Sequence, residues 1–94
     1  MKTLVLTAQF KRDLKLCNRR HYDIARLQCV LDLLMAGQIL PLQYHDHPLV
    51  GNWIPKRECH LAPDWLLIYE TNDTEVRLAR TGTFLAHFRV FRGS

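Results

Sequence analysis

The chain has 94 residues, enough for one domain with one modest core. Hydrophobic residues make up 48% of the chain, which excludes wholesale disorder, and no apolar run approaches the ~20 residues of a membrane span. The formal net charge of +4 favours acidic partners such as nucleic acid or an acidic protein.

The N-terminal half predicts one strand followed by two helices. Residues 3–6 are short and apolar, as in a buried strand. Thr7 and Asp23 are suited to cap the two helices, and Gly37 is suited to end the second. A tight joint at residues 20–22 makes the pair an αα-hairpin. The apolar residues at helical spacing are Phe10, Leu14 and Cys17 in the first helix and Ile24, Leu27, Leu31 and Leu34 in the second.

After Pro41 the pattern changes to that of strands. Residues 53–60 predict a strand interrupted near Pro55, because a proline cannot donate to a strand ladder. Residues 65–69 are consecutive large apolar residues, typical of a central strand, and residues 76–81 alternate between apolar and polar. The sequence also predicts turns at residues 51–52 and 72–73 and a final amphipathic segment at residues 84–91.

These elements predict a single α+β domain over residues 1–94. We expect an N-terminal strand, an αα-hairpin and then three to four antiparallel strands in one twisted sheet. The helices should cover one face of that sheet, because each has one apolar face to bury. Basic residues on the other helical faces have two interpretations, a solvated surface or an RNA footprint, and we favour the solvated surface.

Cysteine usage indicates an intracellular protein. Cys17, Cys29 and Cys59 are an odd count and have no paired spacing. We therefore expect neither a disulfide framework nor a four-thiolate zinc site. The cytoplasm, which keeps thiols reduced, is the expected location.

Residues 44–69 concentrate proton-transfer groups, cations and flat aromatic rings. Imidazoles and carboxylates are costly to bury without partners, so this window is poor material for a core. It suits a cleft that handles an anionic, base-bearing ligand. The residues concerned are His45, Asp46, His47, Trp53, Lys56, Arg57, His60, Asp64 and Trp65.

The chemistry of this window fits metal-independent RNA cleavage. If His60 ends one strand and Asp64 begins the next, the two lie almost opposite each other, and the carboxylate would orient the imidazole. Arg80 could hold a phosphate with a bidentate fork, and Trp65 offers a ring on which a base could stack. Two imidazoles and an arginine supply a proton acceptor, a cation for the phosphorane and a proton donor.

Each of these features also has a simpler interpretation. His45 and His47 could ligate zinc together with His60 and Asp64. Alternatively, His60 and Asp64 could form a structural pair, and Arg80 could be a solvated strand end. Large aromatic residues are more often part of a core than a platform for bases. The functional interpretation therefore depends on the whole set of residues.

The chain also resembles the YafQ branch of the RelE/ParE superfamily of bacterial type II toxins. The resemblance rests on FKRDLKL (10–16), LPLQYHDHPLVGNW (40–53), APDWLLIY (62–69) and RTGT (80–83), with the 57–60 run between them. It implies a ribosome-dependent endoribonuclease that cuts mRNA in the A site and is held inactive by a cognate antitoxin. It also implies family roles at matching positions. His47, His60 and Asp64 match the family's acid–base residues, and Arg80 matches its phosphate-contacting arginine. Trp65 matches the tryptophan of a family motif, and Phe88 matches the family's C-terminal phenylalanine.

One position departs from the family motif. The family continues RTG-[ST]-His, whereas this chain has Phe84 after the RTGT run. His87 follows three residues later and would share a face with residue 84 if that segment is helical. In an extended segment the two would face opposite sides. We expect His87 to replace the missing proton donor. The alternatives are that His47 or His60 donates the proton, or that cleavage is impaired.

These observations together predict a toxin that acts as an mRNA endoribonuclease. We expect no metal and no other cofactor, and no membrane contact. The expected partners are a cognate antitoxin, mRNA and ribosomal RNA, with a monomer when free and a hetero-oligomer with the antitoxin. The rival is a toxin of the same fold that acts by binding the ribosome, gyrase or antitoxin without cutting RNA. The expected site residues are His47, His60, Asp64, Arg80 and His87 for catalysis and Lys56, Arg57, Trp65 and Phe88 for substrate binding.

Overall fold

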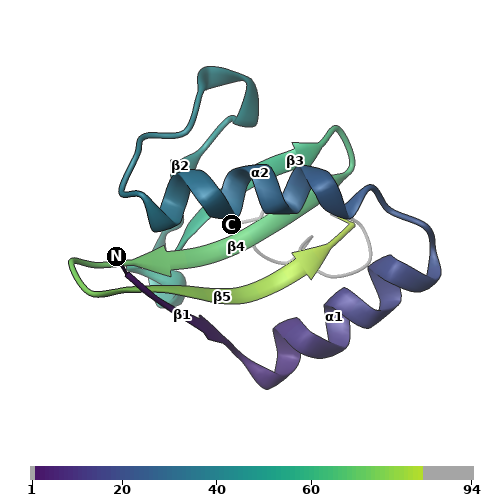
Figure 1. Ribbon diagram of the computed structural model, residues 1–94. Helices are drawn as coiled ribbons and strands as arrows, with labels where there is room; N and C mark the ends of the chain where they lie inside the picture. The colour runs from purple at the N-terminus through teal and green to yellow at the C-terminus, as the bar shows by residue number, and fades with distance from the viewer. Residues whose placement is uncertain (1, 84–94) are drawn as a thin grey trace.

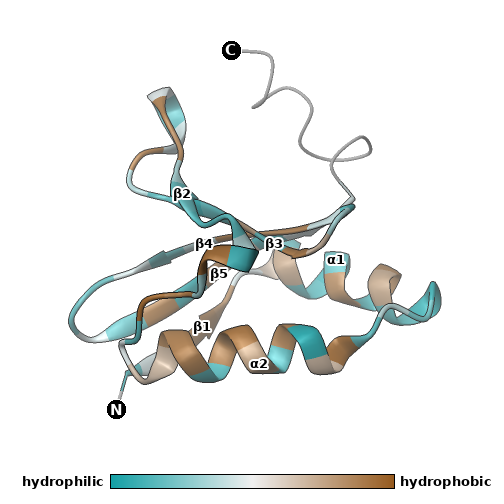
Figure 2. Cartoon of the chain, turned by 90° about the horizontal axis from the view of Figure 1, so that it is seen from above, coloured by the Kyte–Doolittle hydropathy of each residue, from teal (hydrophilic) through white to brown (hydrophobic). Residues whose placement is uncertain are grey.

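The computed structural model describes residues 2–83, which form a five-stranded sheet and two helices (Figure 1). Both helices lie on the same side of the sheet (Figure 2). No helix within the described residues is long and apolar enough to cross a membrane. The elements in chain order are β1 (Thr3–Leu6), α1 (Ala8–Arg19), α2 (Ile24–Met35), β2 (His47–Pro48), β3 (Arg57–Ala62), β4 (Trp65–Thr71) and β5 (Glu75–Gly82).

The strand order is β1-β5-β4-β3-β2. β2 to β5 pair antiparallel, as the sequence predicted, and β1 joins the edge of β5 in parallel. β1 can run parallel to β5 because the αα-hairpin carries the chain across one face of the sheet. The α+β prediction, with a strand, two helices and then antiparallel strands, is confirmed.

Local signals in the sequence account for the helix ends. The Thr7 hydroxyl accepts the Phe10 N–H at 3.0 Å, and the Asp23 carboxylate accepts the Ala25 N–H at 3.2 Å. Both N-caps were predicted. Gly37, at a φ of 72°, follows the end of α2 in the left-handed region that favours glycine. The joint between the helices has the same conformation at His21, with a φ of 61°.

The core lies between the helices and the sheet. Residues of α1 and α2 pack there against alternate residues of the strands, including Cys59 and Leu61 of β3. Because successive strand residues face opposite sides, Glu58 and His60 belong to the other face of the sheet. That face has its own small apolar cluster, made by Leu66, Ile68 and Ala79 with the partly buried Leu49 packed against it.

The predicted strand over residues 53–60 is wrong in its first half. Gly51–Trp53 forms a 3-10 turn, and the peptide between Ile54 and Pro55 is cis. β3 therefore begins only at Arg57. The proline lacks the N–H that a ladder needs, so pairing starts after it. The final amphipathic segment predicted at residues 84–91 lies outside the described residues.

Candidate functional site

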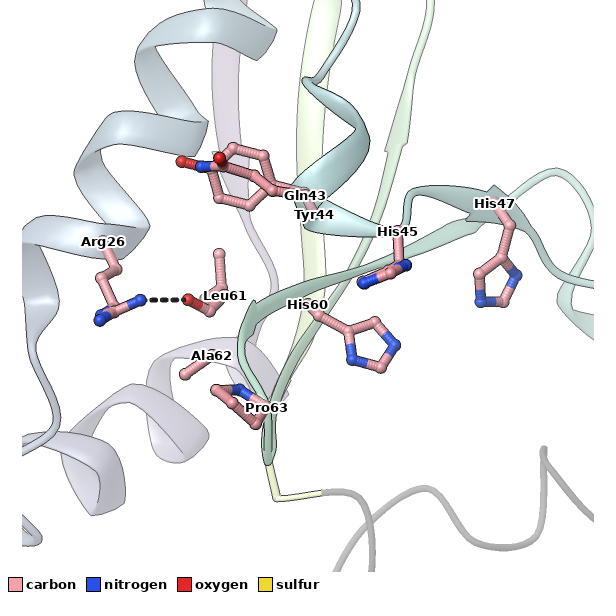
Figure 3. A pocket seen from close by; sticks show the side chains of 9 residues that line it. All are labelled: Arg26, Gln43, Tyr44, His45, His47, His60, Leu61, Ala62 and Pro63. Carbon is pink, nitrogen blue, oxygen red and sulfur yellow. Dashed lines mark hydrogen bonds between the residues drawn. The ribbon is translucent and has the colours of Figure 1, made fainter.

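A cavity of about 660 Å³ opens beside the outer edge of β3. β2 pairs with only the first two residues of β3, so it leaves the rest of that edge uncovered. Figure 3 shows the imidazoles of His45, His47 and His60 at one end of this cavity and Arg26 of α2 at the other. Arg26 donates a hydrogen bond to the carbonyl oxygen of Leu61 at 3.4 Å, which ties α2 to the uncovered edge.

Four side chains at the histidine end form what we call the imidazole cluster: His45, His47, Glu58 and His60. The Nε2 atom of His47 lies 3.0 Å from Oε1 of Glu58, whose side chain is fully buried, whereas the His47 side chain is 45% exposed. The rings of His45 and His60 meet edge to face with centroids 5.5 Å apart. A buried carboxylate thus orients an accessible imidazole, with two more imidazoles beside it.

Three members of the imidazole cluster could hold a metal ion. One ligand atom from each of His47, Glu58 and His60 lies within 4.8 Å of the other two. Imidazole nitrogen and carboxylate oxygen are suitable ligands for zinc and copper. This set differs from the one considered from the sequence, because it contains Glu58 and lacks His45 and Asp64.

Asp46 clamps the segment that carries two of the histidines. Its carboxylate accepts hydrogen bonds from Nε and Nη2 of Arg57, at 3.2 and 3.0 Å, and from the Tyr69 hydroxyl. Burial and the bond to Asp46 raise the pKa of Tyr69, and the same carboxylate raises the pKa of Arg57. The clamp fixes the backbone between His45 and His47. Arg57, expected to bind substrate, already has an acidic partner in Asp46, although its side chain is 37% exposed.

Arg80 is anchored from the helix layer. Its Nε and Nη2 atoms lie 2.8 and 3.3 Å from the carboxylate oxygens of Asp13 on α1. The cross-strand register nevertheless puts Arg80 opposite Ile68, which in turn lies opposite Glu58. Adjacent strands are about 4.8 Å apart, so the Arg80 backbone is about 10 Å from that of Glu58. The alternative of a solvated strand end is wrong for Arg80.

Asp64 is not where the sequence placed it. β3 continues to Ala62 and β4 begins at Trp65, so Asp64 lies in the turn at the tip of the hairpin. His60 lies opposite Leu66 instead. The expected pairing of His60 with Asp64 is therefore wrong, because β3 runs two residues past His60 and Asp64 lies outside β4. The exposed Asp64 lines a second cavity of about 400 Å³, which we call the tip cavity.

The expected base-stacking role of Trp65 does not fit its surroundings. The residue is 3% exposed and belongs to the main core. Its indole N–H donates to the Thr81 hydroxyl at 2.8 Å, and its ring packs edge to face against Tyr22 with centroids 5.1 Å apart. A ring held in this way cannot offer a face to a nucleobase without unpacking the core. We therefore assign Trp65 to the structural support of the hairpin.

The remaining expected residues divide into two groups. The Lys56 ammonium lies 3.7 Å from the Glu70 carboxylate, and both side chains are 28% exposed, so Lys56 already has an acidic partner. His87 and Phe88 lie outside the described residues, and their expected roles stay predictions.

Comparison with known proteins places the chain in a family. The family described as "Bacterial toxin of type II toxin-antitoxin system, YafQ" matches residues 2–91. The chain belongs to the YafQ family. The mRNA interferase toxin YafQ of Escherichia coli K12 is 42% identical over 83 residues, which cover 87% of this chain and 90% of that protein.

Solved structures agree with this family assignment. The crystal structure of the E. coli DinJ–YafQ complex contains a chain that matches this one with a TM-score of 0.87 and 39% identity, covering 94% and 99% of the two chains. A metal-bound toxin from Helicobacter pylori matches with a TM-score of 0.86 and 36% identity, covering 94% and 100%. The RelE-like fold expected from the sequence is confirmed.

Sequence reasoning about this YafQ-family chain missed Glu58 and Asp13. Glu58 could have been found from its spacing, since residues two apart on a strand share a face and Glu58 stands two before His60. His45 was considered only as a metal ligand. Asp13 gave no comparable signal, because its partner Arg80 lies 67 positions away in the chain.

Proposed function

We propose that this YafQ-family toxin is an mRNA interferase that cleaves RNA by metal-independent acid–base catalysis at the imidazole cluster. The observation that carries the proposal is the pair of imidazoles, His47 and His60, whose ring nitrogens lie within 4.8 Å of each other and of the buried Glu58 carboxylate. Cleavage needs one group that accepts a proton and one that donates one, and this pair supplies both. The E. coli relative that bears the name mRNA interferase supports the same activity.

The proposed reaction assigns one proton transfer to each imidazole. His60 accepts the proton of the ribose 2′-hydroxyl, whose oxygen attacks the phosphorus. The bond from phosphorus to the 5′-oxygen breaks, and His47 protonates that oxygen. The products are a 2′,3′-cyclic phosphate and a 5′-hydroxyl. The weaker His47 contact, from Nδ1 to the Pro48 carbonyl oxygen at 3.2 Å, is on the exposed side and is the one that a substrate oxygen would replace.

Arg80 is the proposed cation for the phosphorane. It shares a row across three strands with Glu58, and Asp13 fixes its guanidinium. A preorganised cation stabilises charge that develops in the transition state without having to reorganise during the reaction. The net charge of +4 would also attract RNA to this surface.

We further propose that the toxin acts in the cytoplasm on mRNA in the ribosomal A site and that a cognate antitoxin silences it. The E. coli relative was crystallised in complex with DinJ, which supports an antitoxin partner. An acidic antitoxin segment would complement the positive charge of this chain.

The proposal can be tested by adding the purified chain to translating ribosomes and measuring the rate of mRNA cleavage. His47→Gln and His60→Gln should each slow cleavage by about a hundred- to ten-thousand-fold, the usual contribution of one acid–base group. His21→Asn is the matched control, since this exposed imidazole lies at the helix joint and asparagine tolerates its left-handed backbone. Its rate should stay within about twofold. Unchanged cleavage in both cluster variants would contradict the proposal.

The same assay separates the rival function. A toxin that acts only by binding would block translation, or inhibit gyrase in a parallel assay, while the mRNA ends stay unchanged. In that case His47→Gln would leave growth inhibition intact.

A second candidate activity is binding of a transition metal ion by His47, Glu58 and His60. Their ligand atoms lie within 4.8 Å of one another, and the H. pylori relative is described as metal-bound. Coordination would occupy the imidazole lone pairs that proton transfer needs. The proposed consequence is therefore inhibition of cleavage, which is tested below.

A further inference from the structure

Arg26, in the first turn of α2, is held at the edge of the strand that carries His60. Its Nη1 atom donates to the carbonyl oxygen of Leu61 at 3.4 Å, and Leu61 directly follows His60 in β3. The register between β3 and β4 shifts between His60 and Ala62, so Leu61 has no partner opposite it in β4. An irregularity of this kind redirects backbone groups, and here the Leu61 carbonyl meets the helix layer. A cation therefore lies beside the strand position of the proposed proton acceptor.

The Arg26 guanidinium keeps donors for a ligand. An arginine carries five N–H donors in a planar fork. Within the described residues, Arg26 contacts the Leu61 carbonyl through Nη1, and its Nε atom lies 3.8 Å from the Asp23 carboxylate, while Nη2 makes no hydrogen bond. The Arg26 side chain is 56% exposed and that of Asp23 is 66% exposed. An ion pair this exposed is weak, so it leaves Arg26 able to attract a second anion.

Arg26 lines both the tip cavity and the cavity of the imidazole cluster, and the two differ in charge. In the tip cavity, the carboxylates of Asp23 and Asp64 oppose the charge of Arg26. In the other cavity, the described lining residues include no carboxylate, and they extend from Arg26 to three imidazoles (Figure 3). An anion bound by Arg26 is therefore expected on the side of the imidazole cluster.

The order of groups along this cavity gives the anion a place in the RNA chain. Figure 3 shows His47, His60 and Arg26 in that order. In the proposed reaction, His47 protonates the 5′-oxygen of the nucleotide after the cut, and His60 takes the proton of the ribose before the cut. The direction from His60 to Arg26 therefore follows the RNA upstream. The next negatively charged group in that direction is the phosphate on the 5′ side of the attacking ribose.

We propose that Arg26 binds the phosphate one nucleotide upstream of the cut and so positions the attacking ribose. This inference rests on the proposed nuclease function and adds a substrate-binding residue to it. A guanidinium fork fixes the orientation of a phosphate as well as attracting its charge. The nucleotide before the cut is then held at both of its phosphates, which keeps its 2′-hydroxyl beside His60.

Neutral linkages in the RNA test this assignment one phosphate at a time. Ribosomes are programmed with mRNA that carries one methylphosphonate, a neutral analogue of the phosphate, either one linkage upstream or one linkage downstream of the cut. With wild type at limiting toxin concentration, the upstream methylphosphonate should slow cleavage about tenfold, because it removes a charge-assisted hydrogen bond. Arg26→Gln should slow cleavage of unmodified mRNA about as much, and the upstream methylphosphonate should then have no further effect.

Arg12→Gln is the matched control, since it removes an exposed cation of α1 that lines neither cavity. The upstream methylphosphonate should slow this variant as much as it slows the wild type. Arg26→Lys keeps the charge without the fork, so it should retain part of the upstream effect. If Arg26→Gln slows every mRNA equally and keeps the upstream effect, Arg26 only supports the fold and the proposal is wrong. A loss of the downstream effect in its place would also overturn the assignment.

A binding experiment tests Arg26 even if the wild-type chain cuts no mRNA. A uridine tetranucleotide with 2′-O-methyl groups on every ribose cannot be cleaved by the proposed reaction, and its binding to the purified chain is followed by NMR with each linkage neutralised in turn. Arg26→Gln should remove the effect of one linkage and leave the effects of the others. If it removes the effect of none, Arg26 binds no phosphate. Selective loss at one linkage without any mRNA cleavage would instead overturn only the nuclease function.

Discussion

Arg80 of β5 is bound at two points to the carboxylate of Asp13 on α1, and the Asp13 side chain is 3% exposed. β1 covers β5 only as far as Leu78, and Asp13 also accepts the Thr81 N–H at 3.1 Å on the uncovered part of that edge. The pair therefore joins the helix layer to the strand that carries the proposed phosphate-binding cation. It makes Arg80 part of the fold as well as part of the site.

Arg80→Ala should lower the free energy of unfolding by about 3 kcal/mol, because it leaves a buried carboxylate without its charged partner. Urea unfolding followed by circular dichroism measures the change. Arg77→Ala is the control on the same strand. The Arg77 side chain is 43% exposed and pairs with Glu75, so its loss should cost about 0.5 kcal/mol or less. Equal losses in the two variants would show that the Asp13 pair adds no stability.

The clamp around Asp46 predicts a second effect on stability. Tyr69→Phe removes a buried hydrogen bond to a charged acceptor and should cost about 2 kcal/mol at neutral pH. Tyr44→Phe is the control, since the Tyr44 hydroxyl has no hydrogen-bond partner within the described residues, and it should cost less than about 0.5 kcal/mol. Cleavage by Tyr69→Phe should also slow, because the segment between His45 and His47 loses one anchor.

The same clamp makes the stability difference between the wild type and Tyr69→Phe depend on pH. Burial and the Asp46 carboxylate raise the pKa of Tyr69 in the folded protein above its ordinary value of 10.0. The stability that the neutral phenol provides is therefore full below about pH 10 and is lost as the pH rises further, because the unfolded chain then ionises first. The gap between wild type and Tyr69→Phe should shrink above pH 10. A gap that widens there would contradict this account.

The parts of the fold that sequence reasoning predicted are those with local causes. Thr7 and Asp23 cap helices through N–H groups two or three residues away, and such short-range bonds can be read from the sequence. The central position of β4 followed from its run of apolar residues. Strand ends are different. β3 extends past His60 to Ala62 because Ala62 still pairs with Trp65 of β4, and the sequence of β3 alone does not show this.

The sequence predicted which types of residue form the site better than it predicted which of them contact each other. His47 and His60 lie together as expected, yet the carboxylate beside them is Glu58 and not Asp64. Charged residues are seldom fully buried, so nothing in the composition of this stretch pointed to Glu58 as a buried member of the site. Its burial depends on the return of β2 over β3, which brings His47 opposite Glu58. Long-range pairing of this kind leaves little trace in a single sequence.

The last prediction concerns metal ions at the imidazole cluster. Zinc or copper ions should inhibit mRNA cleavage, because coordination by His47, Glu58 and His60 removes both the proton acceptor and the proton donor. Isothermal titration calorimetry measures binding, and cleavage assays at the same metal concentrations measure inhibition. Excess chelator should restore the rate.

Glu58→Gln provides the decisive variant, because an amide is a weaker metal ligand than a carboxylate of the same shape. Its metal affinity should fall by about ten- to a hundredfold. Glu75→Gln, on β5 and outside the set of ligand atoms, should bind the metal as the wild type does. If a saturating metal ion leaves cleavage unchanged, the ion binds elsewhere on the chain. If Glu58→Gln binds the metal as tightly as the wild type, the buried carboxylate is not a ligand, and its role is to orient His47.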